Sequence, residues 1–243
     1  ERRIELAEKV IEPPGDARPD HEIISSVARS MGFDKEFAHR SSEEVFEEWK
    51  GITRGRICDM NGVTYERLRG KVGPQLPCPD IGHPGTSRLY IDHQFLRPDG
   101  PAALLARKYI EPDDTTNEKY PLVLITGRLP WHFNTRTRTG RVPILNAMEP
   151  DNFVEVNPRD AACLDLNEND NVEIKSRRDS VLAKVRIKDR ILKGTIYMNM
   201  HYGKSLGIGD RKSVNLVTNP AYDINSKQPE LKYCAVNILK ISI

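Results

Sequence analysis

A basic, hydroxyl-rich stretch is the part of this sequence best suited to chemistry. The sixteen residues Thr126–Arg141 contain four threonines, four arginines, one histidine and one asparagine, with no acidic residue. Gly127 permits a sharp turn or a close approach of the backbone to a ligand. Hydroxyls, free backbone N–H groups and guanidinium forks together bind phosphates and other hydrogen-bonding anions. The stretch therefore predicts an anion-binding turn, and the plainer alternative is a solvated loop.

Short strands surround this turn in the sequence. The apolar run Tyr120–Ile125 directly precedes it and is typical of a buried strand. Asn157–Leu164 predicts a short helix with a proline in its first turn. Short strands separated by turns, with one or two small helices, favour a closed barrel over an open sheet. The six predicted strands are Leu122–Thr126, Phe153–Val156, Val172–Ser176, Val181–Ile187, Thr195–Met200 and Tyr233–Ile241.

The first half of the chain has a different character. Its predicted helices are Ile4–Ile11, His21–Met31 after an N-cap at Asp20, and a segment from Ser41 through Trp49. Residues 51–101 are rich in Gly, Pro and Asp, which excludes long regular elements there. Such a segment keeps its shape by packing on something larger. We therefore predict a mixed α/β chain in which residues 1–115 are the helical and irregular tail of a preceding domain. Residues 116–243, mainly β, form the barrel, and Glu111–Lys119 is the linker.

The overall composition limits the possible functions. The chain has 243 residues, with 37 Lys and Arg against 35 Asp and Glu, so its net charge is +2. This length suits one large or two modest domains with a real core. Such balanced charge gives no general case for binding nucleic acid or a membrane surface. No apolar run is long enough to span a bilayer, and no signal peptide opens the sequence. Because the first residue is Glu1 and not Met, we expect further sequence upstream.

Cysteines and familiar catalytic motifs give no independent site. Cys58, Cys78, Cys163 and Cys234 form no Cys-x-x-Cys pair, so they predict free thiols in a reducing, cytoplasmic compartment. The sequence has no Gly-x-Ser-x-Gly, no phosphate-binding Gly-x-x-x-x-Gly-Lys-Ser/Thr and no His-Glu-x-x-His. The turn at Thr126–Arg141 is therefore the leading candidate.

An ordered series of motifs resembles one family. Tyr120–Arg128, followed by His132 and the threonines at 135, 137 and 139, resembles the C-terminal cofactor-binding domain of the molybdopterin oxidoreductases, which include bacterial nitrate reductases and formate dehydrogenases. Upstream, Arg54–Arg56 and Gly85–Tyr90 look most like assimilatory nitrate reductases, so the resemblance covers essentially the whole chain. The remaining matches are Val154–Ala162, Ser176–Arg178, His201–Gly203, Asn215–Thr218 and Asp223–Lys232.

The chain departs from the family pattern in several places. Asn134 stands where the family often has a second histidine, Asp179 replaces a turn glycine, and Ile224 replaces a proline. Lys204–Ser213 forms an insertion rich in glycine and charge, shortly after His201 and Tyr202, which lie where the family brings a segment near the pterin or the substrate funnel.

The resemblance implies a fold and a cofactor. The family's C-terminal domain is a six-stranded double-psi β-barrel that closes over bis(molybdopterin guanine dinucleotide) with molybdenum or tungsten. In the family, earlier domains supply the catalytic metal ligand and a 4Fe-4S cluster. The resemblance therefore assigns no metal ligand and no catalytic residue to this chain, which we expect to be inactive alone.

The resemblance also implies the residues that touch the cofactor. The predicted cofactor-binding residues are Thr126, Gly127, Arg128, His132, Asn134, Thr135, Thr137, His201, Tyr202, Asn215 and Lys232. Plainer alternatives remain for several of them. His132 is alternatively a loop cap, His201 a satisfied core histidine, Asn215 a turn residue, and Lys232 a surface lysine.

Three functions follow from these observations. The first is reduction of nitrate to nitrite by a molybdenum enzyme, and the second is formate oxidation within the same family. The third is a non-catalytic double-psi barrel that binds a protein or a nucleotide, since a fold alone does not fix a function. The first two imply as partners the rest of the catalytic subunit, a small anionic substrate, and an electron-transfer protein such as a ferredoxin or an iron–sulfur or flavin subunit.

Overall fold

The chain forms two compact units, Glu1–Ala106 and Arg107–Ile243, in a computed structural model that describes residues 1–203 and 212–241. Most of the inserted segment Lys204–Ser213 lies outside the described residues. The units divide at Ala106, whereas the sequence places the boundary after residue 115. The segment just before residue 115 belongs to the second unit because the buried Asp114 carboxylate forms ion pairs with Arg177 and Arg178 of that unit.

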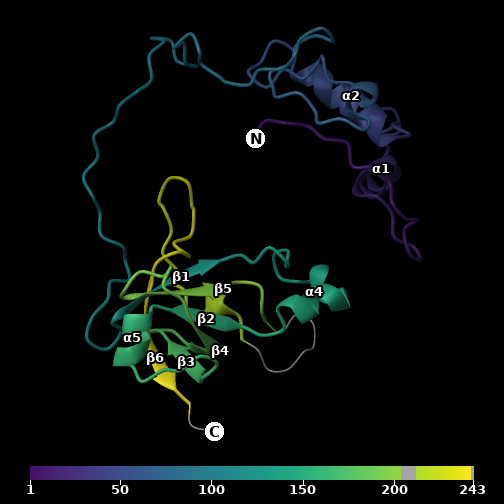
Figure 1. The fold of residues 1–243 in the computed structure, drawn as a ribbon. Helices are drawn as coiled ribbons and strands as arrows, with labels where there is room; N and C mark the ends of the chain where they lie inside the picture. Colours follow the sequence, from purple (N-terminus) through teal and green to yellow (C-terminus); the bar gives the residue numbers. More distant parts are fainter. Residues whose placement is uncertain (204–211, 242–243) are drawn as a thin grey trace. The chain divides into compact units, whose positions relative to one another are not determined.

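The first unit contains α1 (Asp20–Ser30) and α2 (Ser42–Ile52), both labelled in Figure 1, and the short helix α3 (Tyr65–Leu68). The Ser41 hydroxyl accepts a hydrogen bond from the Glu44 N–H, which confirms the predicted start of α2. The N-cap of α1 is Pro19, so Asp20, predicted as the cap, is instead the first residue of the helix.

The helix predicted at Ile4–Ile11 is wrong. This segment contains no helix, and the residues directly before it pair with residues 75–76 of the same unit. Arg3 forms a β-bridge with Gln75, and the Leu76 N–H donates to the Arg2 carbonyl. Eight residues are too few for a helix without tertiary support, and here the support favours an extended backbone.

The first unit has a small core and a conspicuous exposed surface. Phe46, Met60, Val63, Leu68 and Cys78 form its buried cluster. The face of α1 that carries its large apolar side chains is exposed, while Ser25 and Ala28 are the buried residues of that helix. The exposed side chains, here named the α1 apolar face, are Ile23, Ile24, Val27 and Met31.

The second unit is a closed six-stranded barrel in the order β1-β5-β2-β4-β3-β6. Pairs β1–β5 and β2–β4 are parallel, and the other four pairs are antiparallel. This order and these directions are unchanged when β1, β2 and β3 are exchanged with β4, β5 and β6. Such internal two-fold symmetry is the arrangement of a double-psi barrel, so the predicted fold is confirmed.

The predicted strands agree with the structure to within one residue at each end. The observed strands are β1 (Leu122–Gly127), β2 (Phe153–Val156), β3 (Asn171–Lys175), β4 (Ser180–Ile187), β5 (Thr195–Asn199) and β6 (Cys234–Lys240). Helix α5 (Pro158–Cys163) is also as predicted, with the Asn157 side chain accepting from the Arg159 N–H. The sequence did not predict α4 (Pro143–Met148) or the 3₁₀ helices η1 (Thr139–Arg141) and η3 (Val214–Leu216).

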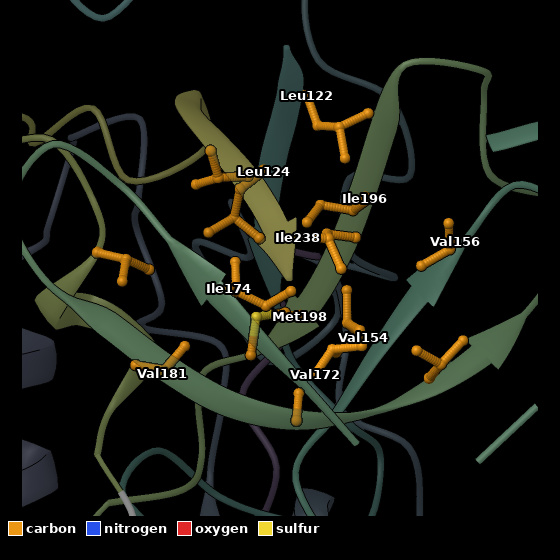
Figure 2. Close-up of a cluster of buried hydrophobic side chains, with 14 of the residues drawn as sticks. Leu122, Leu124, Val154, Val156, Val172, Ile174, Val181, Ile196, Met198 and Ile238 are labelled. Atoms are coloured by element: carbon orange, nitrogen blue, oxygen red, sulfur yellow. The ribbon is translucent and has the colours of Figure 1, made fainter. Parts of the chain in front are cut away.

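Every second side chain along the strands points into the barrel and fills its interior. In β4, Val181, Ala183 and Val185 are buried while Leu182 and Lys184 are exposed, as expected for a strand with one solvated face. Side chains from all six strands meet inside the barrel, with Met198 among Ile174, Val154 and Val172 (Figure 2). This rigid core fixes the strand ends from which the basic turn departs.

Candidate functional site

Thr126 and Lys232 meet where the basic turn begins. The Thr126 hydroxyl donates to the Leu231 carbonyl at 2.8 Å, and the Lys232 ammonium donates to the Thr126 carbonyl. The end of β1, where the turn begins, is thus hydrogen-bonded to the segment just before β6. These two predicted residues, 106 positions apart in the chain, are brought together.

Gly127 accommodates an aromatic ring. A Cβ at this position would lie 2.4 Å from the Tyr197 ring, so no larger residue fits without moving that ring. The Tyr197 hydroxyl also donates to the Arg128 carbonyl at 2.9 Å. The structure therefore explains the glycine by the approach of Tyr197 from β5, and a contact of Gly127 with a ligand stays a prediction.

The arginines of the turn have two different environments. Arg128, Arg138 and Arg141 are exposed. Arg136 is buried, donates to the Asn146 side chain at 2.6 Å, and lies 4.3 Å above the Tyr202 ring. Three cations of the turn are thus available to a ligand, while the fourth holds the turn against the barrel.

The remaining predicted residues of the turn are exposed. The hydroxyls of Thr135 and Thr137 lie 2.8 Å apart, and either is able to donate to the other. Asn134 and Arg136 adopt left-handed backbone angles, with φ of 44° and 64°. Asparagine tolerates this region better than most residues, so Asn134 suits the local bend.

His201 clamps the turn from both sides. Its Nε2 atom accepts from the Leu129 N–H at 2.7 Å, and its Nδ1 atom lies 2.6 Å from the Asn134 carbonyl. One nitrogen must accept and the other must donate, so the ring is the neutral Nδ1–H tautomer. Burial lowers the pKa of His201, and the nearby charges of Arg128 and Arg136 lower it further. Both ring nitrogens of His201 therefore have hydrogen-bond partners within the chain, as expected for a core histidine with a structural role.

We expect His201→Leu to destabilise the second unit by about 2 kcal/mol, because the partly buried Leu129 N–H and Asn134 carbonyl lose their hydrogen-bond partner. The pKa of this histidine is lowered in the folded state, so its contribution is complete above the unfolded value of about 6.5 and is lost as the pH falls. Urea unfolding followed by Trp131 fluorescence at pH 8 and pH 5 measures both effects. A variant with unchanged stability, or with the full acid sensitivity of the wild type, would contradict the clamp.

A second buried group anchors the far end of the turn. The His132 ring lies 3.2 Å from the Thr139 hydroxyl and 3.4 Å from the Glu149 carbonyl, which also accepts from the Tyr202 hydroxyl at 2.5 Å. The Glu149 carboxylate forms a bidentate pair with Arg186 at 2.5 and 2.8 Å. These contacts give His132 and Tyr202 structural partners, and their contact with a cofactor stays a prediction. Sequence reasoning did not identify Glu149, although it is the first acid after the acid-free stretch.

Asn215 stands apart from the other predicted residues. It lies on η3 with an exposed side chain, and its carbonyl accepts from the Thr218 hydroxyl at 2.9 Å. Within the described residues, its side chain makes no hydrogen bond to Thr126 or Lys232. The predicted cofactor contact of Asn215 therefore remains a prediction.

The described residues contain neither a cluster suited to a metal ion nor a helix suited to a membrane. In residues 1–203 and 212–241, no three His, Cys, Asp or Glu side chains are grouped to hold a metal ion. Among the same residues, no helix has the length and apolar character needed to cross a bilayer. All four cysteines are free thiols, with Cys78 and Cys234 buried.

The barrel and its turn match a known family. Residues 122–235 match the Molydopterin dinucleotide binding domain, which spans from β1 into the start of β6. The acetylene hydratase from Pelobacter acetylenicus has a similar structure, with a TM-score of 0.72 and 19% identity. That likeness covers 97% of this chain and 34% of the hydratase, and it shows the fold alone.

Relatives align with almost the whole chain. It is 40% identical to a nitrate reductase of Synechocystis and 36% identical to the F420-dependent formate dehydrogenase 2 subunit alpha of Methanococcus maripaludis, over 99% of its own length in each case. The chain spans 34% of the length of each of these relatives. Residues 122–235 are therefore a molybdopterin dinucleotide-binding domain, and almost the whole chain is similar to one part of these nitrate reductase and formate dehydrogenase subunits.

Proposed function

We propose that the second unit binds molybdopterin guanine dinucleotide through the turn Thr126–Arg141, assisted by Lys232 and Asn215. The observation that carries this proposal is an acid-free turn with three exposed arginines, tied to Lys232 at its base. The first acid after it, Glu149, is already neutralised by Arg186. This donor set suits a pyrophosphate, whose oxygens accept from guanidinium, ammonium and hydroxyl groups.

Each part of the site has its own task in this proposal. Arg128, Arg138 and the threonine hydroxyls bind phosphate oxygens, and Asn215 offers a donor and an acceptor to a base edge. His201 and His132 stabilise the conformation of the turn through their contacts with Leu129, Asn134 and Thr139. When bound, a molybdenum or tungsten cofactor supplies two-electron redox chemistry, while the chain orients it. The metal ligand and a 4Fe-4S cluster come from other parts of the enzyme, so the chain alone is inactive.

Nitrate is the substrate that we propose for the assembled enzyme, supported by the 40% identity to a nitrate reductase. Formate is the second candidate, supported by the 36% identity to a formate dehydrogenase subunit. Electrons reach the cofactor from a ferredoxin or an iron–sulfur or flavin subunit. We propose a cytoplasmic location because the chain keeps four free thiols.

Analysis of the purified complex tests the cofactor. We expect molybdenum or tungsten together with guanine nucleotide and phosphorus, and absence of both metal and nucleotide would refute the proposal. Parallel assays with reduced viologen and nitrate, and with oxidised viologen and formate, identify the substrate. The non-catalytic alternative predicts a barrel that carries neither metal nor dinucleotide.

The α1 apolar face is where we propose that the first unit packs on the rest of the catalytic subunit, since this chain spans only 34% of the length of the relative. Ile24→Glu with Val27→Glu places two charges on that face, and we expect loss of co-purification with the remaining subunit portion. Val10→Glu, which alters a more exposed residue outside α1, is the control and should assemble normally. Equal assembly of both proteins would contradict this packing.

A further inference from the structure

Asn199, the last residue of β5, has a buried side chain with nothing to bond. It is 1% exposed, and within the described part of the chain neither its Nδ2 nor its Oδ1 atom has a hydrogen-bond partner. A buried amide without partners costs about 1–3 kcal/mol, so native proteins seldom keep one without a reason. The position therefore calls for a partner outside the chain itself.

Its neighbours place Asn199 at the base of the basic turn. It is the residue of β5 that pairs with Gly127 in the parallel ladder, and the next N–H, of Met200, donates to the Gly127 carbonyl at 2.9 Å. Tyr197 and His201, two residues before and after it, hold the Arg128 carbonyl, the Leu129 N–H and the Asn134 carbonyl. The residues on either side thus bind the turn, whereas the side chain of Asn199 between them has no hydrogen-bond partner among the described residues.

We propose that Asn199 is a ligand-contacting residue whose amide pairs with the 2-amino-4-oxopyrimidine edge of the ligand held by the turn. This inference rests on the function proposed above, and it identifies the part of the ligand that reaches the end of β5. Because the amide is buried beside the turn, contact with the ligand requires that the hydrogen bonds of His201 to Leu129 and Asn134 open when the ligand binds.

The chemistry of the amide selects this class of ligand. An asparagine presents one acceptor and two donor hydrogens in a plane. Phosphate oxygens would satisfy only the donors and leave Oδ1 unpaired. The pterin and guanine rings share a lactam edge with both a donor and an acceptor, which satisfies both ends of the amide. The exposed arginines remain the phosphate contacts.

Titration of the full chain with three probes tests the proposal. GDP and 6-hydroxymethylpterin each carry the ring edge, while inorganic pyrophosphate carries only phosphate oxygens. For Asn199→Leu we expect at least one ring probe to bind about ten-fold more weakly, with pyrophosphate binding unchanged. The probe that loses affinity identifies whether the guanine or the pterin contacts Asn199.

Matched variants separate ligand binding from folding. Asn199→Leu removes an unpaired amide, so its melting temperature without probe should equal or exceed that of the wild type. Asn199→Ser keeps a small polar group and should also weaken the ring probe, which secures the test if the leucine variant misfolds. Asn152→Leu is the control, because Asn152 is buried with an unpaired Oδ1 but donates to the Leu182 carbonyl of β4.

Each remaining outcome has a definite meaning. Ring binding by Asn199→Leu and Asn199→Ser within two-fold of the wild type would overturn the inference and indicate that a buried water satisfies the amide. Wild-type binding of pyrophosphate but of neither ring probe would also overturn it, leaving the phosphate site intact. Failure of the wild type to bind any probe would overturn the proposed function, and the inference with it.

Discussion

Replacement of Gly62 by alanine is expected to unfold the first unit, with a loss of about 3 kcal/mol. An added Cβ would lie 1.9 Å from the Asp80 carbonyl oxygen and 2.4 Å from its carbon. Both are backbone atoms, so no change of rotamer relieves the clash. The same segments are joined by hydrogen bonds from the Gly62 N–H to Cys78 and from the Cys78 N–H to Asp59. Hydrogen exchange resolved by mass spectrometry should show lost protection in residues 1–106 only.

The matched control is Gly51→Ala in α2. A Cβ there meets nothing within 4 Å, and alanine is the better helix former by up to about 1 kcal/mol. We therefore expect Gly51→Ala to leave protection unchanged or to increase it. Equal protection in Gly62→Ala and the wild type would mean that the two backbone segments do not approach as closely as the structure has them.

Asp114→Ala is expected to destabilise the second unit by about 3 kcal/mol. The buried carboxylate accepts from Arg177 and from Arg178, and also from the Ala235 N–H at the start of β6. Removing it leaves two guanidinium groups without their acid, and breaking a buried pair costs about 3–5 kcal/mol. We expect a loss at the lower end of this range because the side chains of both arginines are partly exposed to solvent. Urea unfolding of the barrel, followed by Trp131 fluorescence, measures the loss.

Acid unfolding provides a second measurement at the same residue. Burial alone would raise the pKa of Asp114, but the hydrogen bond and charge of Arg178, together with hydrogen bonds from Cys234 and the Ala235 N–H, lower the pKa below its ordinary value. Its contribution is therefore complete above the unfolded pKa of about 3.9 and is lost as the pH falls through the folded value. The wild type should lose its advantage over Asp114→Ala below about pH 4. The neighbouring exposed Asp113→Ala should match the wild type throughout.

The barrel could be predicted from sequence because its pattern is local. Alternation in Val181–Val185 and the apolar run Leu122–Ile125 set strand boundaries without knowledge of their neighbours. The helix at Ile4–Ile11 failed because its conformation depends on a bridge to Gln75, about seventy residues away. Helix α4 was missed because Pro143–Met148 is short and has no side-chain cap.

The candidate site was predictable in composition but not in its internal contacts. The acid-free turn identified the exposed arginines, and the family motifs pointed to Lys232, which does meet Thr126. Nothing in the sequence indicates that Arg136 faces inward onto Tyr202 while Arg138 faces outward. Asn199 gave no signal either, because a single asparagine at a strand end usually marks a turn. Such assignments depend on three-dimensional pairing between β1 and β5.

The strand order of the barrel determines when it can close during synthesis. Of the six strand pairs, only β3–β4 joins consecutive strands through a short connection, residues 176–179. Strand β6 pairs with both β1 and β3, yet it is the last strand to leave the ribosome. Until Cys234–Lys240 arrives, β1 and β3 each retain an unpaired edge that is prone to association with other chains. The nascent barrel therefore folds late and slowly, after nearly all of it has been translated.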